Sequence, residues 1–209
     1  MNLVAANRTT FRGWLEQPAS ELVDHGQPCC SRARAWLQAM AVSHAFHRSD
    51  DTAIAAPSFL SRHYKWGPTA WPTAWCEAVR APAIDCGVFS AFARAILNAQ
   101  GVECYSGQVM QHFNPETTAH WRQYWTRLPG SFNWIDDELV YHEVVIVVAD
   151  EVAEVFDPTH GEWLSPTDTA GYGAVVGVRS GCPKSLPWGR HTLTMDQWRL
   201  TVPTLSWGG

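Results

Sequence analysis

Residues 139–148 constrain the fold of this chain more than any other segment. They read Leu-Val-Tyr-His-Glu-Val-Val-Ile-Val-Val and are rich in β-branched residues, which favour a pleated strand. After Glu143 the run has no polar residue, which predicts burial on both faces. Asp150 and Glu151 fit a hairpin turn, so residues 152–156 are expected to return as an antiparallel partner. The segment therefore predicts the central strand of an antiparallel sheet.

A helix is predicted ahead of this sheet. Asp85 can serve as its N-cap, and apolar residues follow at positions 88, 92, 95, 96 and 99, on one helical face. Gly101 supplies the C-terminal stop. Residues 102–110 alternate in polarity and predict a half-buried strand, and residues 175–178 predict another. A helix followed by an antiparallel sheet is an α+β arrangement, with this helix packed on the sheet.

The whole chain, residues 1–209, is expected to form a single domain, because no internal repeat or linker interrupts it. Residues 10–23 and 31–47 are predicted helices, the second with Ser31 as its N-cap. Residues 57–82 contain prolines and a glycine and predict a loop with a short helix. The parts are a helical N-terminal region to about residue 83, a core over about 84–165 and an irregular C-terminal region over 166–209.

Composition and charge exclude several classes of partner. The net charge is −5, the isoelectric point is near 6.0, and no run of basic residues is present, which argues against nucleic acid or an anionic membrane surface. The apolar stretch at residues 144–149 is too short to span a bilayer. The first residues lack the apolar core of a signal peptide. We therefore expect a cytoplasmic protein without a membrane partner; its oligomeric state is not determined by the sequence.

Metal and disulfide sites are not predicted. Six cysteines are present, and without a secretory signal they are expected to be free thiols. Cys29 and Cys30 are adjacent, which suits neither a mutual disulfide nor a pair of zinc ligands. A zinc-protease motif beginning at His142 fails because Ile146 stands where the second ligand is needed. The remaining histidines are predicted to be structural or exposed, among them His44, His47, His112, His120, His160 and His191.

Three residues on separate elements can form a nucleophilic site. Cys86 begins the predicted helix, His142 lies in the central strand, and Asp157 ends the next strand. A free thiol has a pKa of about 8.5, and a helix N-terminus or a nearby imidazolium favours the thiolate. A histidine can take and return a proton near neutrality. An aspartate on its other ring nitrogen fixes the tautomer and stabilises the imidazolium.

The same residues lie in three blocks that resemble the transglutaminase-like superfamily. The resemblance covers about residues 84–159. Its blocks are Asp85-Cys86-x-x-x-x-Ala91-x-x-x-Ala95-Ile96-Leu97-x-Ala99-x-Gly101-Val102, then Tyr141-His142-Glu143-Val144, then Val155-Phe156-Asp157-Pro158-Thr159. It implies a papain-like fold and thioester chemistry, with Cys86 as nucleophile, His142 as base and acid, and Asp157 orienting His142. The chain departs from many relatives at Val144, where they have an aromatic residue, and at Cys104-Tyr105, where they often have Ala-Arg.

The resemblance also suggests where the substrate lies. The backbone N–H of Cys86 can donate to an oxyanion. Related enzymes can use an upstream Trp as a second donor, which here is Trp66, Trp71 or Trp75. Residues 114–138 form an aromatic insert before the central strand, and Trp121 and Trp125 within it are expected to line one wall of the site. No cofactor is implied.

The function expected from these features is cysteine-dependent acyl transfer through a thioester. The expected partner is a small-molecule, peptide or carrier-bound acyl substrate, and the product is an amide on a biosynthetic intermediate. One alternative is a cysteine peptidase or amidase, because water can replace the amine at the same acyl-enzyme. A second alternative is an inactive member of the fold that binds peptides. A thiol-redox or metal protein is the weakest hypothesis, because the chain has no Cys-x-x-Cys motif.

Overall fold

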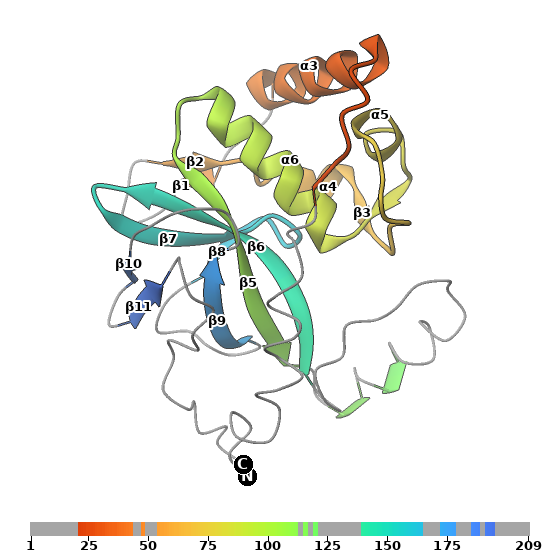
Figure 1. The fold of residues 1–209 in the computed structure, drawn as a ribbon. Coiled ribbons are helices and arrows are strands. Elements are labelled where there is room, and N and C mark those ends of the chain that lie inside the picture. Colours follow the sequence, from red (N-terminus) through yellow and green to blue (C-terminus); the bar gives the residue numbers. More distant parts are fainter. Residues whose placement is uncertain are drawn as a thin grey trace.

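The structure, a computed structural model, describes residues 21–43, 47–48, 54–112, 115–116, 119–120, 139–164, 172–178, 185–188 and 191–194. Its centre is a five-stranded sheet in the order β8-β7-β6-β5-β9, antiparallel at every pairing, with helix α6 across one face (Figure 1). The strands are β5 (Cys104–His112), β6 (Leu139–Ala149), β7 (Val152–Asp157), β8 (Glu162–Leu164) and β9 (Tyr172–Val178). Mixed helix and antiparallel sheet confirm the predicted α+β class.

Strand β6 is the middle strand of the sheet, as its sequence predicts. Four successive side chains from Val144 to Val147 are fully buried, so both faces of the strand are covered. The turn into β7 has Asp150 at φ 48° and Glu151 at φ 63°. Two successive left-handed residues are what a type I′ hairpin turn requires. The predicted central strand and its hairpin are therefore confirmed.

Helix α6 (Cys86–Ala99) begins and ends where its sequence predicts. The side chain of its N-cap, Asp85, accepts a hydrogen bond from the Val88 N–H at 2.9 Å. At the other end Gly101 has φ +76°, and the Val102 N–H donates to the Leu97 carbonyl at 3.0 Å. This is a Schellman ending, in which glycine takes the left-handed conformation at no steric cost.

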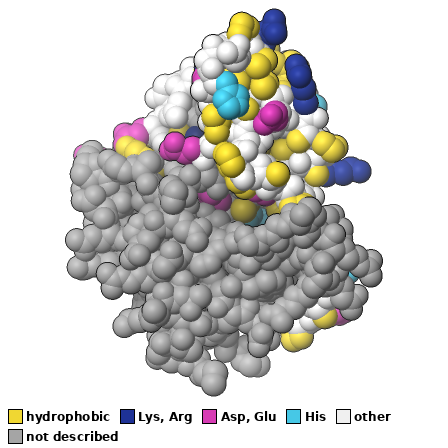
Figure 2. All heavy atoms as spheres, turned by 45° about the vertical axis from the view of Figure 1, so that its right-hand side comes forward, with side chains coloured by type: hydrophobic (Ala, Val, Ile, Leu, Met, Phe, Trp, Pro, Cys, Tyr) yellow, Lys and Arg dark blue, Asp and Glu magenta, His cyan; other side chains and the backbone are white. Residues whose placement is uncertain are grey.

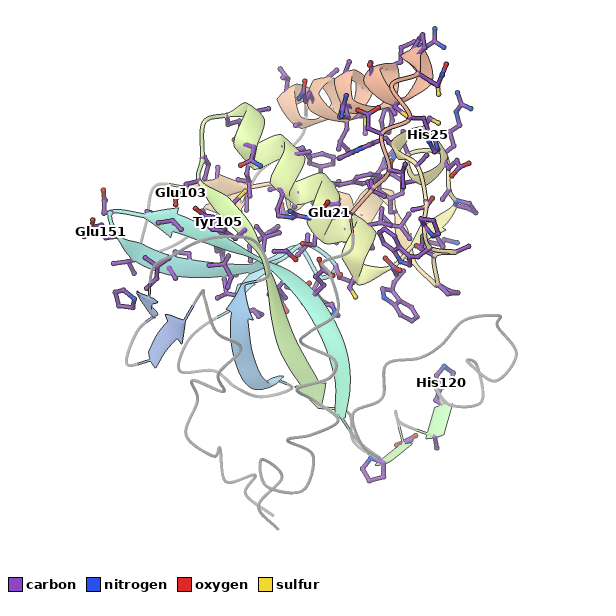
Figure 3. All side chains as sticks on the ribbon, viewed as in Figure 1. Glu21, His25, Glu103, Tyr105, His120 and Glu151 are labelled. Atoms are coloured by element: carbon purple, nitrogen blue, oxygen red, sulfur yellow. The ribbon has the colours of Figure 1, made fainter. Side chains whose placement is uncertain are left out.

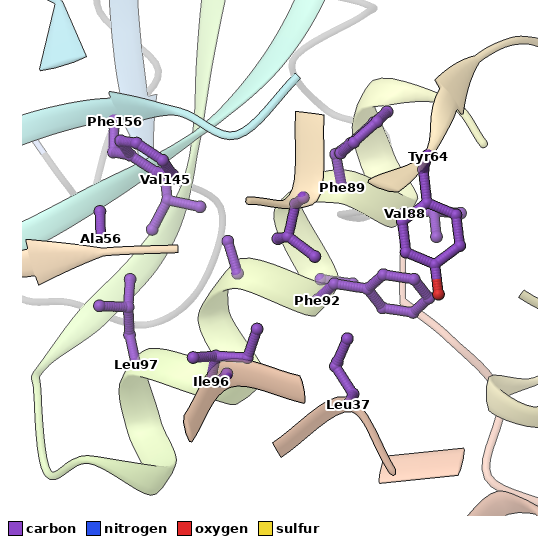
Figure 4. Packing of buried hydrophobic residues seen from close by; sticks show 14 of the residues in the cluster. Leu37, Ala56, Tyr64, Val88, Phe89, Phe92, Ile96, Leu97, Val145 and Phe156 are labelled. Carbon is purple, nitrogen blue, oxygen red and sulfur yellow. The ribbon is translucent and has the colours of Figure 1, made fainter. Parts of the chain in front are cut away.

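The main hydrophobic core lies on both sides of α6. Val145 and Phe156 come from the sheet, and Leu37 comes from α3 (Pro28–Ser43), which lies on the other side of the helix (Figures 1 and 4). Between them, Val88 and Phe92 of α6 are fully buried. A helix that is buried on opposite sides is an internal element rather than a surface one. Its position therefore depends on both layers.

The N-terminal helices differ from their predictions. Helix α3 begins at Pro28, three residues before the predicted cap Ser31, and ends at Ser43. Proline suits a first helical turn because it has no N–H to leave unpaired. Residues 21–23 of the predicted helix 10–23 are not helical, and Val23 forms a parallel bridge with Ala74. Residues 1–20 lie outside the described residues.

The described residues between 47 and 84 form short helices and strands that precede α6 in the sequence. A two-residue antiparallel pair joins β1 (His47–Arg48) to β2 (Ala55–Ala56), so His47 is in a strand rather than the predicted helix. One-turn helices α4 (Leu60–His63) and α5 (Trp75–Ala78) interrupt the predicted loop. Strand β3 (Lys65–Trp66) pairs in parallel with β4 (Ala83–Ile84), directly before Asp85. Sequence patterns did not predict these two-residue pairs, because such short strands have no measurable periodicity.

The C-terminal region is more regular than expected. Residues 172–178 form β9 at the sheet edge, which extends the predicted strand 175–178. Strands β10 (Ser185–Trp188) and β11 (His191–Thr194) form a hairpin, and Leu186 joins a second core cluster with Val144 and Ile146. The irregular assignment for 166–209 is therefore wrong for these strands. In the aromatic insert only residues 115–116 and 119–120 are described, so Trp121 and Trp125 lie outside the described residues.

The described surface is mixed in character. Figure 2 shows acidic, basic and hydrophobic side chains interspersed over the described part of one face. Among the described residues, no helix has both the length and the apolar character needed to cross a membrane.

Gly107 in β5 offers a test of the sheet packing. A Cβ built there would lie 2.6 Å from Cγ1 and 2.8 Å from Cδ1 of Ile146, which is fully buried on β6. We expect Gly107→Ala to lower the free energy of unfolding by about 1–3 kcal/mol in urea titrations, as overpacking usually does. In an Ile146→Ala background the same change should cost much less. An equal cost in both backgrounds would contradict the packing described here.

Candidate active site

Cys86 is the first residue of α6, and the helix is attached to β6 one turn later. The Ser90 hydroxyl is buried and donates to the Val144 carbonyl at 3.2 Å. Because Ser90 follows Cys86 by four residues, the two lie on the same helix face. That hydrogen bond therefore fixes the half-buried Cys86 over the end of β6 that carries His142 and Glu143.

His142 and Asp157 meet across the β6–β7 pair. The His142 Nε2 lies 2.9 Å from Asp157 Oδ2, and the two side chains are 5% and 0% exposed. Neighbouring strands bring them together although they are 15 residues apart in sequence. Since Nε2 meets the carboxylate, proton exchange with a thiol would use Nδ1. Two of the three residues predicted to act together are thus in direct contact.

Asp157 also binds a second imidazole that the sequence analysis treated as structural or exposed. His160 Nδ1 lies 2.7 Å from the same Oδ2, and the Thr159 N–H donates to Oδ1 at 2.9 Å. Burial alone would raise the pKa of Asp157, but His142 and His160 outweigh it and hold that pKa far below its usual value. Asp157 is therefore a permanently charged anchor for two histidines. The three-residue spacing between Asp157 and His160 was the sequence signal from which this contact could have been predicted.

The ligand atoms of these three side chains all lie within 4.8 Å of one another. Both imidazole nitrogens are at hydrogen-bond distance from one oxygen, Asp157 Oδ2. The three side chains therefore form a hydrogen-bonded cluster around one carboxylate.

Glu143 is a buried neighbour of Cys86 that sequence reasoning missed. Its side chain is fully buried and accepts a hydrogen bond from Ser106 Oγ at 2.5 Å. Alternation along β6 gives Glu143 the same face as Val145 and Val147, which pack in the core cluster with α6. The backbone N–H of Glu143 hydrogen-bonds the Cys86 sulfur. Cys86 therefore contacts the strand directly beside His142.

The electrostatic surroundings of Cys86 oppose ionisation. Burial raises the pKa of its thiol well above the ordinary value, and the negative charges of Asp85, Glu143 and Asp157 raise it further. The Glu143 N–H acts in the opposite direction but does not compensate. The expectation of an easily formed thiolate is therefore wrong for this arrangement. Cys86 is a neutral thiol at rest.

Asp85 links the helix start to a tryptophan at the surface. Its Oδ2 accepts a hydrogen bond from Trp71 Nε1 at 2.6 Å, and its N–H donates to Thr69 Oγ1 at 3.0 Å. Burial raises the pKa of Asp85 to about 6, although these hydrogen bonds and the one from Val88 oppose the rise. Trp71 is 37% exposed and contacts the residue that directly precedes Cys86 in the sequence.

The other two upstream tryptophans occupy different surroundings. Trp75 stacks on Phe92 with ring centroids 5.8 Å apart and carries the Arg34 guanidinium 5.8 Å above its ring. Trp66 is partly buried against the same core cluster. Of the three candidates for the second oxyanion donor, Trp71 is the one bonded to the residue preceding Cys86, and its N–H is directed at Asp85.

No protein-family model, no curated protein and no solved structure matches this chain. Its function is therefore inferred from the residues and geometry of this site.

The surroundings of Cys86 predict how it reacts. With wild-type protein, alkylation of Cys86 by iodoacetamide should be slow at pH 7 and should keep rising above the ordinary thiol pKa of about 8.5. Asp85→Asn keeps a helix cap but removes a negative charge beside the sulfur. It should speed alkylation at a fixed pH by roughly 3–10-fold. Peptide mapping by mass spectrometry measures the rate at Cys86.

Asp24→Asn is the matched control, since Asp24 pairs with Arg34 beside α3 rather than with the site. It should leave the rate at Cys86 unchanged. A wild-type rate that has already reached a plateau at pH 7 would contradict the neutral thiol.

His160 predicts a pH dependence of stability. Its hydrogen bond to Asp157 raises the pKa of the imidazole above the ordinary value of about 6.5, against the effect of burial. A raised histidine pKa stabilises the fold below the unfolded pKa, and this contribution is lost as pH rises through the folded pKa. In urea titrations, His160→Ala should therefore destabilise the protein more at about pH 6 than at about pH 9. Equal losses at both pH values would refute a charged His160.

Proposed function

We propose that this chain is a cysteine enzyme of the transglutaminase-like, papain-like type, which passes an acyl group through a thioester on Cys86. The observation that supports the proposal is the 2.9 Å contact between His142 and Asp157 on adjacent strands. A buried carboxylate on one ring nitrogen leaves the imidazole one tautomer and stabilises its charged form. These are the requirements of a general base.

The first half-reaction follows from these roles. The Cys86 sulfur attacks the substrate carbonyl carbon while its proton passes to Nδ1 of His142. The tetrahedral intermediate then collapses: the bond to the leaving amine breaks, and His142 returns the proton to that amine. The product is a thioester on Cys86. Asp157 stays ionised throughout, because its pKa is held far below its usual value.

The raised thiol pKa of Cys86 favours one form of this mechanism. A preformed thiolate is disfavoured, since burial and the charges of Asp85, Glu143 and Asp157 raise the pKa of the thiol. Proton transfer to His142 therefore accompanies attack, as it does for a serine nucleophile. A thiolate would form only when a substrate carbonyl is in place to accept the sulfur.

The second half-reaction decides between transfer and hydrolysis. An amine or a water attacks the thioester, gives its proton to His142, and releases the acyl product as the proton returns to sulfur. Transfer to an amine on a small-molecule, peptide or carrier-bound intermediate is our proposal, in keeping with an exposed aromatic ring, Trp71, beside the nucleophile. Hydrolysis of an amide by the same residues is the alternative within this class.

A binding protein without chemistry is the second candidate function. The observation that favours it is the raised pKa of the Cys86 thiol, caused first by burial and then by the charges of Asp85, Glu143 and Asp157. A protein that binds acyl or peptide ligands but never forms an adduct on Cys86 would belong to this class.

Intact mass spectrometry with a panel of acyl thioesters and peptide amides tests the proposal. Wild-type protein should acquire an acyl adduct that maps to Cys86 and disappears when an amine is added. His142→Ala should lower the rate of adduct formation by about 10²–10⁴-fold, the usual value of a general base. Asp157→Asn should leave more activity than His142→Ala, because it removes the orienting group alone.

Cys104→Ser provides the matched control. Cys104 is a buried thiol that hydrogen-bonds the Arg94 carbonyl and Asn98 Oδ1 toward the far end of α6, and its loss should not change adduct formation. Circular dichroism establishes that each variant is folded. An adduct that persists in folded Cys86→Ser protein, or an unchanged rate in folded His142→Ala protein, would reject the mechanism.

A further inference from the structure

Three cysteine thiols meet where helices α3 and α5 pack together. Cys29 and Cys30 lie in the first turn of α3, and Cys76 is the second residue of α5. Their sulfur atoms all lie within 4.8 Å of one another, and the Cys30 and Cys76 sulfurs are 3.9 Å apart. Cys30 is fully buried, whereas the other two are partly exposed. The cluster can therefore be reached from solvent on one side.

The distance between the Cys30 and Cys76 sulfurs matches two thiolates bound to one metal ion rather than a disulfide bond. A disulfide holds its sulfurs about 2.05 Å apart. Thiolates at about 2.3 Å from a tetrahedral zinc ion lie about 3.8 Å from one another. The Cys30–Cys76 distance of 3.9 Å is close to the second value. All three sulfurs lie within 4.8 Å of one another, so one cation between them could contact all three.

The local charges also favour thiolates at this point. Helix α3 is 16 residues long and has no acidic side chain in its first turn, so the positive end of its dipole faces the cysteines. The backbone N–H groups of His25 and Cys76 donate to the Cys30 sulfur. His25 lies beside the start of α3 (Figure 3).

Cysteine binds a metal as the thiolate, so a bound cation would hold all three cysteines deprotonated beside one another.

We propose that Cys29, Cys30 and Cys76 form a three-thiolate site for a thiophilic d10 cation, Zn²⁺ or Cu⁺, that joins α3 to α5. Binding would release the protons of the thiols that ionise. Three ligands alone give the trigonal geometry that Cu⁺ accepts, whereas Zn²⁺ takes a fourth ligand such as water. The site consists of residues other than Cys86, His142 and Asp157, so it does not depend on the proposed acyl transfer.

Metal titration of the reduced, chelator-treated full chain tests this site. One equivalent of Zn²⁺ or Cu⁺ should bind and raise the melting temperature, and Co²⁺ should give a thiolate-to-cobalt charge-transfer band. The two metals are titrated separately against competing chelators. The metal that binds more tightly indicates whether the site is trigonal, as Cu⁺ accepts, or four-coordinate, as Zn²⁺ prefers. Cys29→Ser and Cys76→Ser should each weaken binding at least about tenfold.

Cys104→Ser and Cys86→Ser are the controls and should bind the metal as the wild type does. Cys30 is left unchanged, because its full burial makes a folding defect the expected result of replacing it. The proposal is overturned if reduced wild-type protein binds neither metal, if Cys76→Ser binds as tightly as wild type, or if Cys86→Ser abolishes binding. Thioester formation is also measured in the Cys29→Ser and Cys76→Ser variants. This measurement distinguishes failure of the metal site from failure of the acyl-transfer proposal.

Discussion

The packing of α6 against β6 is the contact on which the rest of the molecule depends. Val88 and Phe92 are buried between the sheet and α3, and Ser90 bonds the carbonyl of Val144. A shift of one helical turn would move Cys86 about 5.4 Å along the axis and out of reach of β6. The hydrophobic core therefore sets the position of Cys86, and the cap at Asp85 sets the residue at which the helix begins.

Charge is distributed unevenly between the two halves of the site. Asp157 is buried with two imidazoles, so its carboxylate is strongly stabilised. Cys86 has the opposite surroundings, with Asp85 and Glu143 beside it and a neutral thiol as the result. In the proposed mechanism, the base would thus be prepared for proton transfer while the nucleophile would not.

Local signals account for the elements that were predicted well. A capping aspartate, a glycine after the last turn and a 3.6-residue apolar pattern define α6 within about 17 residues of sequence, and β-branched residues with a two-residue turn define β6 and β7. Ser31 was a wrong cap because serine also occurs inside helices, and Pro28 was the stronger start signal. Strand β9 was predicted only over residues 175–178, because the β-branched residues of this segment lie there. Strands β10 and β11 were missed because each has only four residues, too few to show a two-residue period.

The sequence alone determined the helix that begins at Cys86, the central strand with His142, and the strand that ends at Asp157. Each of these depends on residues a few positions apart, whose side-chain period is set by backbone geometry. Only the tertiary structure decided that His160 shares Asp157, that Glu143 and Asp85 surround the thiol, and that Cys76 meets Cys29 and Cys30. The physical reason is that most of these contacts join segments far apart in the chain, and packing of the whole core brings such segments together.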